Sequence, residues 1–311
     1  MHAVITLVEG HFLNGAAALY NSLVGNQFNG VFIIGNRGRD TLPKTTLDLM
    51  ESLPANLPPI QFIQVETNWH FTNFKPAFIR QVFDSHPEFD AITYLDPDIV
   101  VCGPWPWLGG WCQHGPAVAG DVNWRIGPNH PTRHEWTALL RAVNLDARQC
   151  PETYLNGGMV SVRREDLAFI ELWQRIIEEV GANDNPLDGV GDISAWRQGG
   201  RWNPMHTPDQ DALNLAAMAW EGSLSVLGPD AMGFAPGGPP LLAHAVGPNK
   251  PWERRHLSEA LRGKPPRFVD KAYTDHAVSP IPVHGKASHR RRLRALKAAA
   301  LIGRFYRRSG L

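Results

Sequence analysis

The sequence predicts an α/β fold with a mixed, mainly parallel central sheet and helices on both faces of that sheet. Over the first hundred residues, short apolar runs alternate with segments of helical periodicity. The spacing of these runs leaves room for a helical crossover between successive strands, which is typical of a parallel sheet. Ligands of such sheets bind beyond the carboxyl ends of the strands, so we expect the chemistry at that edge.

Four strands and three helices are predicted in the first part of the chain. The strands lie at residues 3–8, 30–35, 60–65 and 90–95, and the helices at 13–25, 41–53 and 74–86. We place Pro76 in the first turn of the third helix, where proline is tolerated.

The rest of the chain is predicted to be less regular. Residues 103–111, "GPWPWLGGW", are too rich in Gly, Pro and Trp for a regular element, and the stretch from Gly181 to His206 is interpreted as a lid or acceptor loop. Further strands are predicted at 116–122, 157–164 and 241–246, and further helices at 134–143, 164–181 and 208–220.

The composition indicates an ordinary globular protein. The 311 residues are 43% apolar and 19% charged, and the three cysteines lack metal-site spacing, which favours a reduced, cytosolic compartment. The amino terminus is expected to be a strand rather than a signal peptide. No segment approaches the roughly 20 apolar residues that span a bilayer.

Charge is unevenly distributed along the chain. Nine basic residues and no acidic ones follow Asp275, so residues 1–275 carry 21 basic and 30 acidic side chains. Apolar residues recur at helical spacing among the arginines of this tail, at Leu293, Leu296, Ala300 and Phe305. The tail is interpreted as a basic amphipathic helix on an anionic membrane surface, with a disordered solubilising tail as the alternative. Nucleic acid is not an expected partner, because the body is acidic and carries no nucleic-acid motif.

Asp96 and Asp98 interrupt the apolar stretch "DAITYLDPDIVVCG" at the carboxyl end of the fourth strand. Two carboxylates in one tight turn can converge on a divalent cation, and hard oxygen ligands suit Mg²⁺ or Mn²⁺. An acidic turn that caps a helix or faces water explains the pair equally well. The flanking apolar runs favour a site, because they tie the turn to the core.

His244, Gly247 and Lys250 form a second motif, "HAVGPNKPW", after the last predicted strand. Imidazole is a good ligand for Mn²⁺, lysine is a compact charge suited to phosphate, and glycine lets the backbone approach a ligand. A structural histidine followed by a solvated lysine is the alternative.

Further polar residues follow strands or begin a helix. Asp121 ends an apolar strand, Asn156 and Gly157 belong to "YLNGG", and Asp209 and Gln210 belong to "TPDQDALN" at a helix start. Each has a structural alternative. Asp121 could cap a helix or turn, Asn156 and Gly157 could form a tight turn, and the acidic residue Asp209 could interact with the helix dipole. The dipole gives no reason for the glutamine.

In this order, the motifs resemble those of metal-dependent, nucleotide-sugar glycosyltransferases of the GT-A fold. The nearest resemblance is to glycosyltransferase family 8, which includes glycogenin and bacterial lipopolysaccharide galactosyltransferases. It covers residues 3–252, and its most specific part is H-x-x-G-x-x-K-P-W. The resemblance implies that Asp96, Asp98 and His244 bind Mn²⁺ (or Mg²⁺), which grips the diphosphate of a nucleotide sugar.

The resemblance also implies which residues contact the donor, a UDP-hexose. Lys250 and the backbone at Gly247 would meet the diphosphate. The sugar would be held by Asp121, Asn156 and Asp209, with Gln210 below its anomeric carbon.

Four more residues complete the donor-binding set implied by the resemblance: Thr6, Glu9, Lys75 and Gly157. Lys75 is preferred to Arg80 as the basic residue because we expect it in the first turn of its helix. Glu9 is the candidate contact to the base, and Thr6 is a weaker one.

The predicted function is transfer of a hexose from the nucleotide donor to a glycan or glycolipid, with retention of anomeric configuration. Retention is implied by the resemblance, and front-face attack is favoured because no well-placed carboxylate nucleophile is evident. The enzyme is expected in the cytoplasm, peripheral on the cytoplasmic face of the membrane. One alternative is a sugar-phosphate nucleotidyltransferase, disfavoured because "VEGHFLNGAAAL" lacks a basic glycine-rich loop. The other is a catalytically silent sugar- or lipid-binding protein.

Two domains are predicted. Residues 1–265 form the GT-A domain, with a donor-binding half to about residue 125 and an acceptor-side half at 126–265, and residues 266–311 form the basic extension. Tryptophans concentrated in the irregular middle are candidates either for stacking on acceptor sugars or for the core: Trp105, Trp107, Trp111, Trp124, Trp196 and Trp202.

Overall fold

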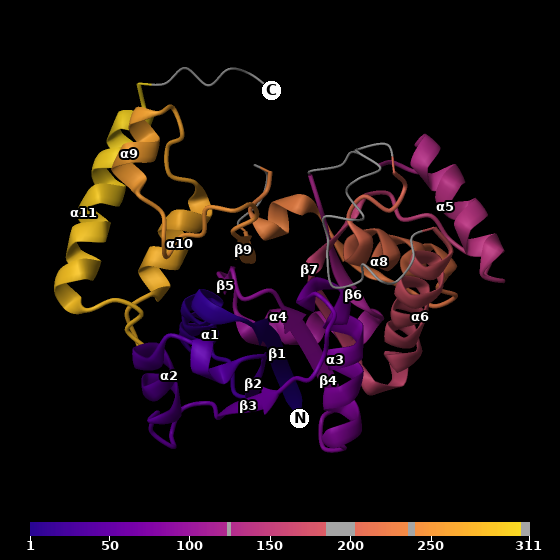
Figure 1. Ribbon diagram of the computed structural model, residues 1–311, viewed down its shortest axis with the longest axis horizontal. Coiled ribbons are helices and arrows are strands. Elements are labelled where there is room, and N and C mark those ends of the chain that lie inside the picture. The colour runs from indigo at the N-terminus through magenta and orange to yellow at the C-terminus, as the bar shows by residue number, and fades with distance from the viewer. Residues whose placement is uncertain (123–125, 185–202, 236–239, 306–311) are drawn as a thin grey trace.

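A seven-stranded sheet forms the centre of the molecule, with strand order β3-β2-β1-β4-β7-β6-β8. The computed structural model describes all residues except 123–125, 185–202, 236–239 and 306–311, and within 181–184 it describes the backbone only (Figure 1). The sheet strands are β1 (His2–Val8), β2 (Val31–Asn36), β3 (Ile60–Gln64), β4 (Ala91–Leu95), β6 (Ala117–Gly120), β7 (Leu155–Arg163) and β8 (Ser225–Leu227). A separate two-stranded sheet pairs β5 (Ile99–Val101) with β9 (Leu242–His244).

Strand direction brings several strand ends to one edge of the large sheet. β1 pairs in parallel with β2 and β4, whereas β7 pairs antiparallel with β4 and with β6. The carboxyl ends of β1, β2, β4 and β6 therefore meet the amino end of β7 at the same edge. The prediction of a mixed, mainly parallel sheet is confirmed.

Helices cover both faces of the sheet, as Figure 1 shows. In β1, Ile5 and Leu7 belong to the core on the face of α3, α5, α6 and α8, while Val4 and Val8 belong to the core on the face of α1, α2 and α4. The helices in chain order are α1 (Leu13–Gly25), α2 (Lys44–Glu51), α3 (Phe71–Ser85), α4 (Trp105–Trp111), α5 (Pro131–Ala142), α6 (Leu167–Asp184), α8 (Pro208–Ala219), α9 (His256–Leu261), α10 (Phe268–His276) and α11 (Lys286–Gly303).

Helix α3 begins earlier than the sequence predicted. The ring nitrogen Nδ1 of His70 accepts a hydrogen bond from the backbone N–H of Thr72 at 3.3 Å and caps the helix, so Phe71 is its first residue. Pro76 lies inside the helix rather than in its first turn, and the placement of Lys75 in the first turn was likewise wrong. The histidine cap was missed because histidine is not among the usual capping residues.

The predicted irregular stretch at residues 103–111 was also wrong, because residues 105–111 form α4. Pro104 precedes the helix and Pro106 occupies its second position, where the missing N–H has no partner within the helix in any case. Trp105, Leu108 and Trp111 are buried at helical spacing, so this pair of tryptophans serves the core. Trp107 is 55% exposed. The other three candidate tryptophans and most of the predicted lid lie outside the described residues.

The carboxyl-terminal segment packs against the body of the molecule. α10 contacts α1, β5 and β9, and the side chain of Asn21 donates hydrogen bonds to the carbonyls of His276 and Ile281, both at 2.7 Å. α11 packs along α9. The division of the chain at residue 265 stays a prediction.

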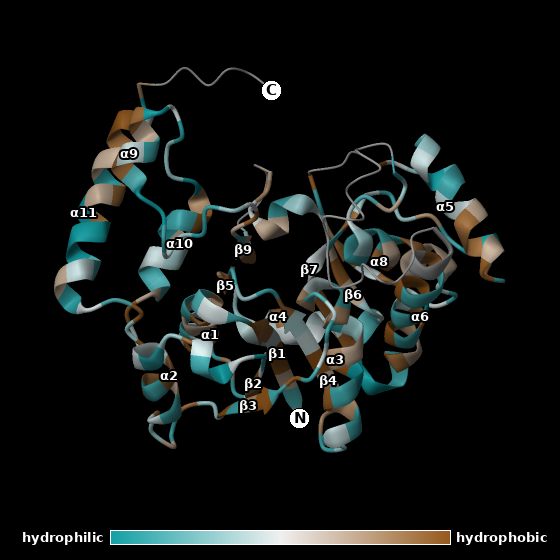
Figure 2. Cartoon of the chain, viewed as in Figure 1, coloured by the Kyte–Doolittle hydropathy of each residue, from teal (hydrophilic) through white to brown (hydrophobic). Residues whose placement is uncertain are grey.

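Helix α11 is helical, as predicted, but its polarity is arranged differently. Figure 2 shows a hydrophilic first half and a more hydrophobic end. Of the residues in the predicted apolar stripe, Leu296 is buried and Leu293 half-buried, whereas Ala300 is exposed and Phe305, just beyond the helix, is 83% exposed. The predicted apolar stripe is therefore split between the protein interior and the surface. Within the described part of the chain, no helix is both long and apolar enough to cross a membrane.

Candidate active site

The turn between β4 and β5 places Asp96 and Asp98 at the carboxyl edge of the sheet. The N–H of Ile99 bonds the carbonyl of Asp96 at 3.0 Å, which closes a turn with Pro97 at its second position, where proline is favoured. The N–H of Asp96 donates to the carbonyl of Gly158 on β7 at 2.8 Å. The turn is thus fixed at both ends, as the flanking apolar runs suggested.

Strand pairing brings His244 to the same turn. In the small sheet Ile99 lies opposite His244, and the N–H of Ala245 donates to the carbonyl of Asp98 at 3.0 Å. The imidazole Nε2 lies 3.2 Å from Oδ1 of Asp98 and 3.6 Å from Oδ2 of Asp96. The side chain of His244 therefore lies next to both aspartates, although it is about 150 residues away in the sequence.

These three side chains fit a divalent cation. One ligand atom from each of Asp96, Asp98 and His244 lies within 4.8 Å of the others. A Cβ on Gly158 would come within 2.4 Å of the His244 ring and 2.9 Å of the Asp96 carboxylate, so glycine keeps this space open. The other imidazole nitrogen, Nδ1 of His244, is buried without a hydrogen-bond partner among the described residues. Two carboxylates and one imidazole form a donor set that suits Mn²⁺.

Lys250 reaches the Asp98 carboxylate from the loop after β9. Its Nζ lies 2.5 Å from Oδ2 of Asp98 and donates to the carbonyl of Ala245 at 3.0 Å. Burial alone would raise the pKa of Asp98, but His244 and Lys250 outweigh burial and hold that pKa well below its usual range. Asp98 is therefore an ionised carboxylate despite its burial.

Lys75 links the Asp96 carboxylate to the start of α8. It is 3% exposed, and its Nζ lies 3.2 Å from Asp96, 3.1 Å from Asp209 and 2.9 Å from the carbonyl of Gly157. Burial alone would lower the pKa of Lys75, yet Asp96 and Asp209 outweigh it and raise the pKa above its usual value. Lys75 is thus a permanently charged centre between two acids.

A second network joins the remaining predicted sugar-binding residues. The side chain of Asn156 donates to Asp121 at 2.6 Å, and the amide of Gln210 donates to the same carboxylate oxygen at 3.1 Å. The Gln210 carbonyl accepts the N–H of Gly157 at 2.9 Å. The glutamine between the two acids of α8, which the helix dipole left unexplained, therefore bridges β7 and the end of β6.

Sequence reasoning missed a buried pair directly behind this network. The hydroxyl of Tyr154 donates to Asp211 at 2.7 Å, and the N–H of Thr207 donates to the other carboxylate oxygen at 2.5 Å. Burial raises the pKa of Asp211 to about 8. Tyr94 was also missed, although its position two residues before Asp96 on a strand is a usable signal; its hydroxyl donates to Asp96 at 3.0 Å.

A cavity of about 510 Å³ opens over this site. The metal-site turn and both lysines line it on one side, and residues after β1 together with the start of α3 line the other: Glu9, His11, Phe12, His70, Phe71 and Thr72. Its size fits a small ligand. The cavity extends from the metal-site turn to the end of β1, which is the edge where the parallel sheet predicts ligand binding.

The remaining predicted donor residues lie at different places around this cavity. Glu9 lines it and forms an ion pair with Arg37 at 2.7 Å, a partner that the sequence did not suggest. Thr6 is fully buried in β1, and it is not among the described residues that line the cavity. Gly247 has a φ of +94°, which favours glycine, and lines a different cavity together with Arg254 and Arg267.

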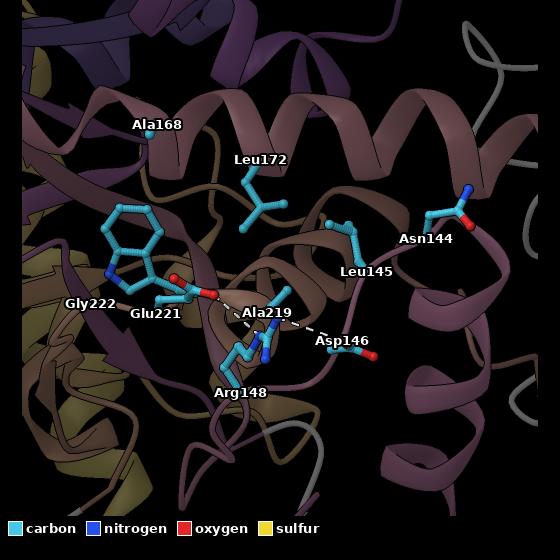
Figure 3. A pocket seen from close by; sticks show the side chains of 10 residues that line it. Asn144, Leu145, Asp146, Arg148, Ala168, Leu172, Ala219, Glu221 and Gly222 are labelled. Atoms are coloured by element: carbon cyan, nitrogen blue, oxygen red, sulfur yellow. Dashed lines mark ion pairs between the residues drawn. The ribbon is translucent and has the colours of Figure 1, made fainter.

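Another cavity, of about 470 Å³, lies at the opposite end of α8 (Figure 3). Arg148 forms ion pairs there with Asp146 at 3.6 Å and Glu221 at 3.3 Å. All three charged side chains are exposed, and Arg148 is paired with both acids. None of the predicted site residues lines this cavity as described, whereas Glu9, Lys75, Asp96, Asp98 and Lys250 line the cavity of about 510 Å³.

No protein-family model and no curated protein matches the sequence, but solved structures match the fold. A galactosyltransferase, LgtC, solved with donor and acceptor sugar analogues, is 15% identical, with a TM-score of 0.52 over 93% of this chain and 99% of that chain. The chain has the GT-A fold. An active-site mutant of LgtC gives a TM-score of 0.51 at 13% identity, over 89% of this chain and 95% of that one.

The bifunctional glycosyltransferase WbbM is similar as well. Its structure without ligands is 14% identical, with a TM-score of 0.56 over 93% of this chain, which spans 51% of the WbbM chain. At such identities the matches establish the fold alone. The predicted GT-A architecture is thereby confirmed, while the roles of individual site residues stay predictions.

Proposed function

We propose that this protein is a metal-dependent glycosyltransferase that moves a hexose from a nucleotide-diphosphate sugar, a UDP-hexose, to a glycan or glycolipid acceptor. The observation that carries the proposal is the convergence of Asp96, Asp98 and His244 beside a cavity that the two aspartates, Lys75 and Lys250 line. Glycosyl transfer is the known activity of the LgtC and WbbM proteins that share this fold.

The charges of the site match a diphosphate held through a cation. A bound Mn²⁺ would neutralise the negative charge that develops on the departing diphosphate. Asp96, Asp98 and His244 are the residues that would hold the ion. Lys250 lies on the loop beside them, where its ammonium group can stabilise phosphate charge by positioned electrostatics.

The neighbouring network is suited to holding and orienting a sugar. Asp121, Asn156 and Gln210 fix one another through side-chain hydrogen bonds, so their remaining donors and acceptors have set directions. Such pre-orientation reduces the entropy lost when hydroxyl groups bind. We assign Asp209 to the same sugar-binding network.

We propose retention by front-face attack. Asp209 is bound to Lys75, and the Gln210 carbonyl is bound to the N–H of Gly157, so neither group is a free nucleophile. In front-face attack, the leaving phosphate accepts the proton of the acceptor hydroxyl, and the protein needs only to position both groups.

We further propose that α11 approaches the cytoplasmic face of an anionic membrane, where a glycolipid acceptor would be located. Arg290, Arg291, Arg294 and Lys297 are exposed on this helix, and Arg304 is exposed just after it. Basic residues near an anionic surface contribute about 1 kcal/mol each, so this set supports reversible binding.

The deciding experiment is a panel of nucleotide sugars tested with and without Mn²⁺, by calorimetry for binding and by nucleotide release for turnover. Mn²⁺-dependent binding and release of UDP from a UDP-hexose are expected. Absence of both with every donor would refute the proposal. Binding without turnover, in the presence of candidate glycan acceptors, would identify a silent binding protein instead.

A variant pair links the activity to the metal site. Asp98→Asn is expected to weaken Mn²⁺-dependent nucleotide binding by more than the roughly 10- to 100-fold that follows loss of a group supporting a metal ligand. Asp146→Asn, an exposed aspartate at the other cavity, is the matched control. Equal nucleotide affinity in the two variants would remove Asp98 from the metal site.

A further inference from the structure

The loop between β9 and α9 carries two of the predicted diphosphate contacts, Gly247 and Lys250. We call residues 246–251 the phosphate loop. Gly247 has a positive φ, and nothing lies within 4 Å of where its Cβ would be, so the middle of this loop has few neighbours. Its conformation must therefore be set largely from its ends.

Both ends of the phosphate loop are bound by arginines from the carboxyl-terminal segment. Arg267, which precedes α10, donates from Nη1 to the carbonyl of Val246 at 2.9 Å. Arg292, in α11, donates from Nη2 to the carbonyl of Pro251 at 2.6 Å. Hydrogen bonds from charged donors are stronger than neutral ones, so these are firm anchors.

The arginine at the first anchor is itself fixed. The backbone N–H of Arg267 donates to the buried carboxylate of Asp270 at 2.7 Å, and the same carboxylate is ion-paired with Arg254. The N–H of Arg254 donates in turn to the carbonyl of Lys250 at 3.1 Å. Asp270 of α10 thus contacts both the arginine that binds the start of the loop and the arginine whose N–H binds the carbonyl of Lys250.

The second anchor lies beside an aromatic cluster that reaches the donor cavity. Trp252 follows Pro251 and packs against Tyr273 of α10, with ring centroids 5.6 Å apart. Its indole N–H donates to His11, which lines the cavity, at 2.8 Å. Movement at Pro251 would therefore be felt on the cavity wall as well as at Lys250.

We infer that Arg267 and Arg292 are positioning residues that hold the phosphate loop in its diphosphate-binding conformation, so that the carboxyl-terminal helices set the affinity for the donor. The inference rests on the proposed function for the identity of the ligand. Ordering one residue of a loose loop costs about 1–2 kcal/mol. A loop that is already anchored does not incur this cost when the ligand binds, so its affinity for the ligand is higher.

Arg292→Met tests the inference, because α11 lies outside the catalytic cavity. With Mn²⁺ and UDP as the probes, we expect the Kd for UDP to rise about tenfold, and the KM for the donor with it, while kcat changes less than about twofold. The Kd for Mn²⁺ alone should not rise, because the metal ligands are not on the loop and a displaced Lys250 would compete less for Asp98. Arg292→Lys should recover part of the UDP affinity. Arg291→Met, its exposed neighbour on the same helix, is the matched control.

Amide hydrogen exchange provides a readout that does not depend on ligand. The amides of Glu253 and Arg254, which both donate to the carbonyl of Lys250 at 3.1 Å, should exchange faster in Arg292→Met than in wild type or Arg291→Met, with the melting temperature unchanged. Wild-type UDP affinity in Arg292→Met, or unchanged exchange at these amides, would overturn the inference. If wild-type protein binds no nucleotide with Mn²⁺, the proposed function fails, and the exchange result alone decides whether the arginines anchor the loop.

Discussion

Lys250 and Asp98 form an ion pair that joins the predicted phosphate-binding residue to a predicted metal ligand, across 152 positions of sequence. The ammonium group and a divalent cation would therefore act on the same carboxylate. Because the ammonium group and the cation are both positive, they repel each other beside Asp98. A bound diphosphate is negative and attracts both of them.

Lys250→Met should consequently change two affinities in opposite directions. Binding of Mn²⁺ alone should become stronger by about 1 kcal/mol or more, since two unit charges 4 Å apart interact by about that much even in water. Binding of Mn²⁺–UDP should become weaker, because the phosphate loses a cation. Calorimetric titrations of both ligands check this, and weaker binding of Mn²⁺ alone would contradict the role given to Lys250.

Lys75→Met should destabilise the fold strongly. The substitution leaves Asp96 and Asp209 without their shared buried cation, and breaking a buried ion pair in this way costs about 3–5 kcal/mol. Urea unfolding measures the loss, and adding Asp209→Asn should restore part of it. Lys44→Met is the control, because its ion pair with Asp48 is exposed and should contribute less than about 1 kcal/mol.

Gly158→Ala should damage the metal site while Gly110→Ala should not. An added methyl at Gly158 meets the His244 ring and the Asp96 carboxylate, so one of these ligands must move. At Gly110 nothing lies within 4 Å of the added methyl. Mn²⁺ titration of the two variants is the measurement, and equal affinity would show that the space beside Gly158 is not needed for the ion.

Stability should fall with rising pH through the raised pKa of Asp211. The folded protein retains this proton up to about pH 8, whereas the unfolded chain releases it near the usual value of 3.8. Between these values the unfolded state binds fewer protons, so the free energy of unfolding decreases by up to about 1.4 kcal/mol per pH unit.

Asp211→Asn should remove this slope, since asparagine stays neutral and can still accept the N–H of Thr207. Urea unfolding of both proteins between pH 5.5 and 8 measures the difference. Parallel pH profiles for the two would show that Asp211 is ionised in the folded protein.

The sequence predicted the fold because the fold depends on local patterns, and the same patterns located the candidate site residues at strand ends. Apolar periodicity located the strands, and strand direction then requires the residues that follow β1, β4 and β6 to meet at one edge. His244 joined the aspartates in the prediction through the family motif, and the structure supplies the physical reason in the pairing of β5 with β9.

What escaped prediction depends on contacts between distant segments. Nothing near Arg267 or Arg292 in the sequence indicates that they bind backbone carbonyls of the phosphate loop. The bond between Tyr154 and Asp211 needs the packing of α8 on β7, and α4 was missed because its glycines and prolines outweighed the helical spacing of its buried residues.

The pairing of Ile99 with His244 also has a consequence for the newly made chain. Ribosomes add roughly 5–20 residues per second, so the histidine follows the aspartates by on the order of ten seconds, and Arg292 comes later still. During that interval the emerging polypeptide presents an acidic turn that has neither its histidine nor its lysine. The proposed metal site can therefore assemble only after His244 has been synthesised.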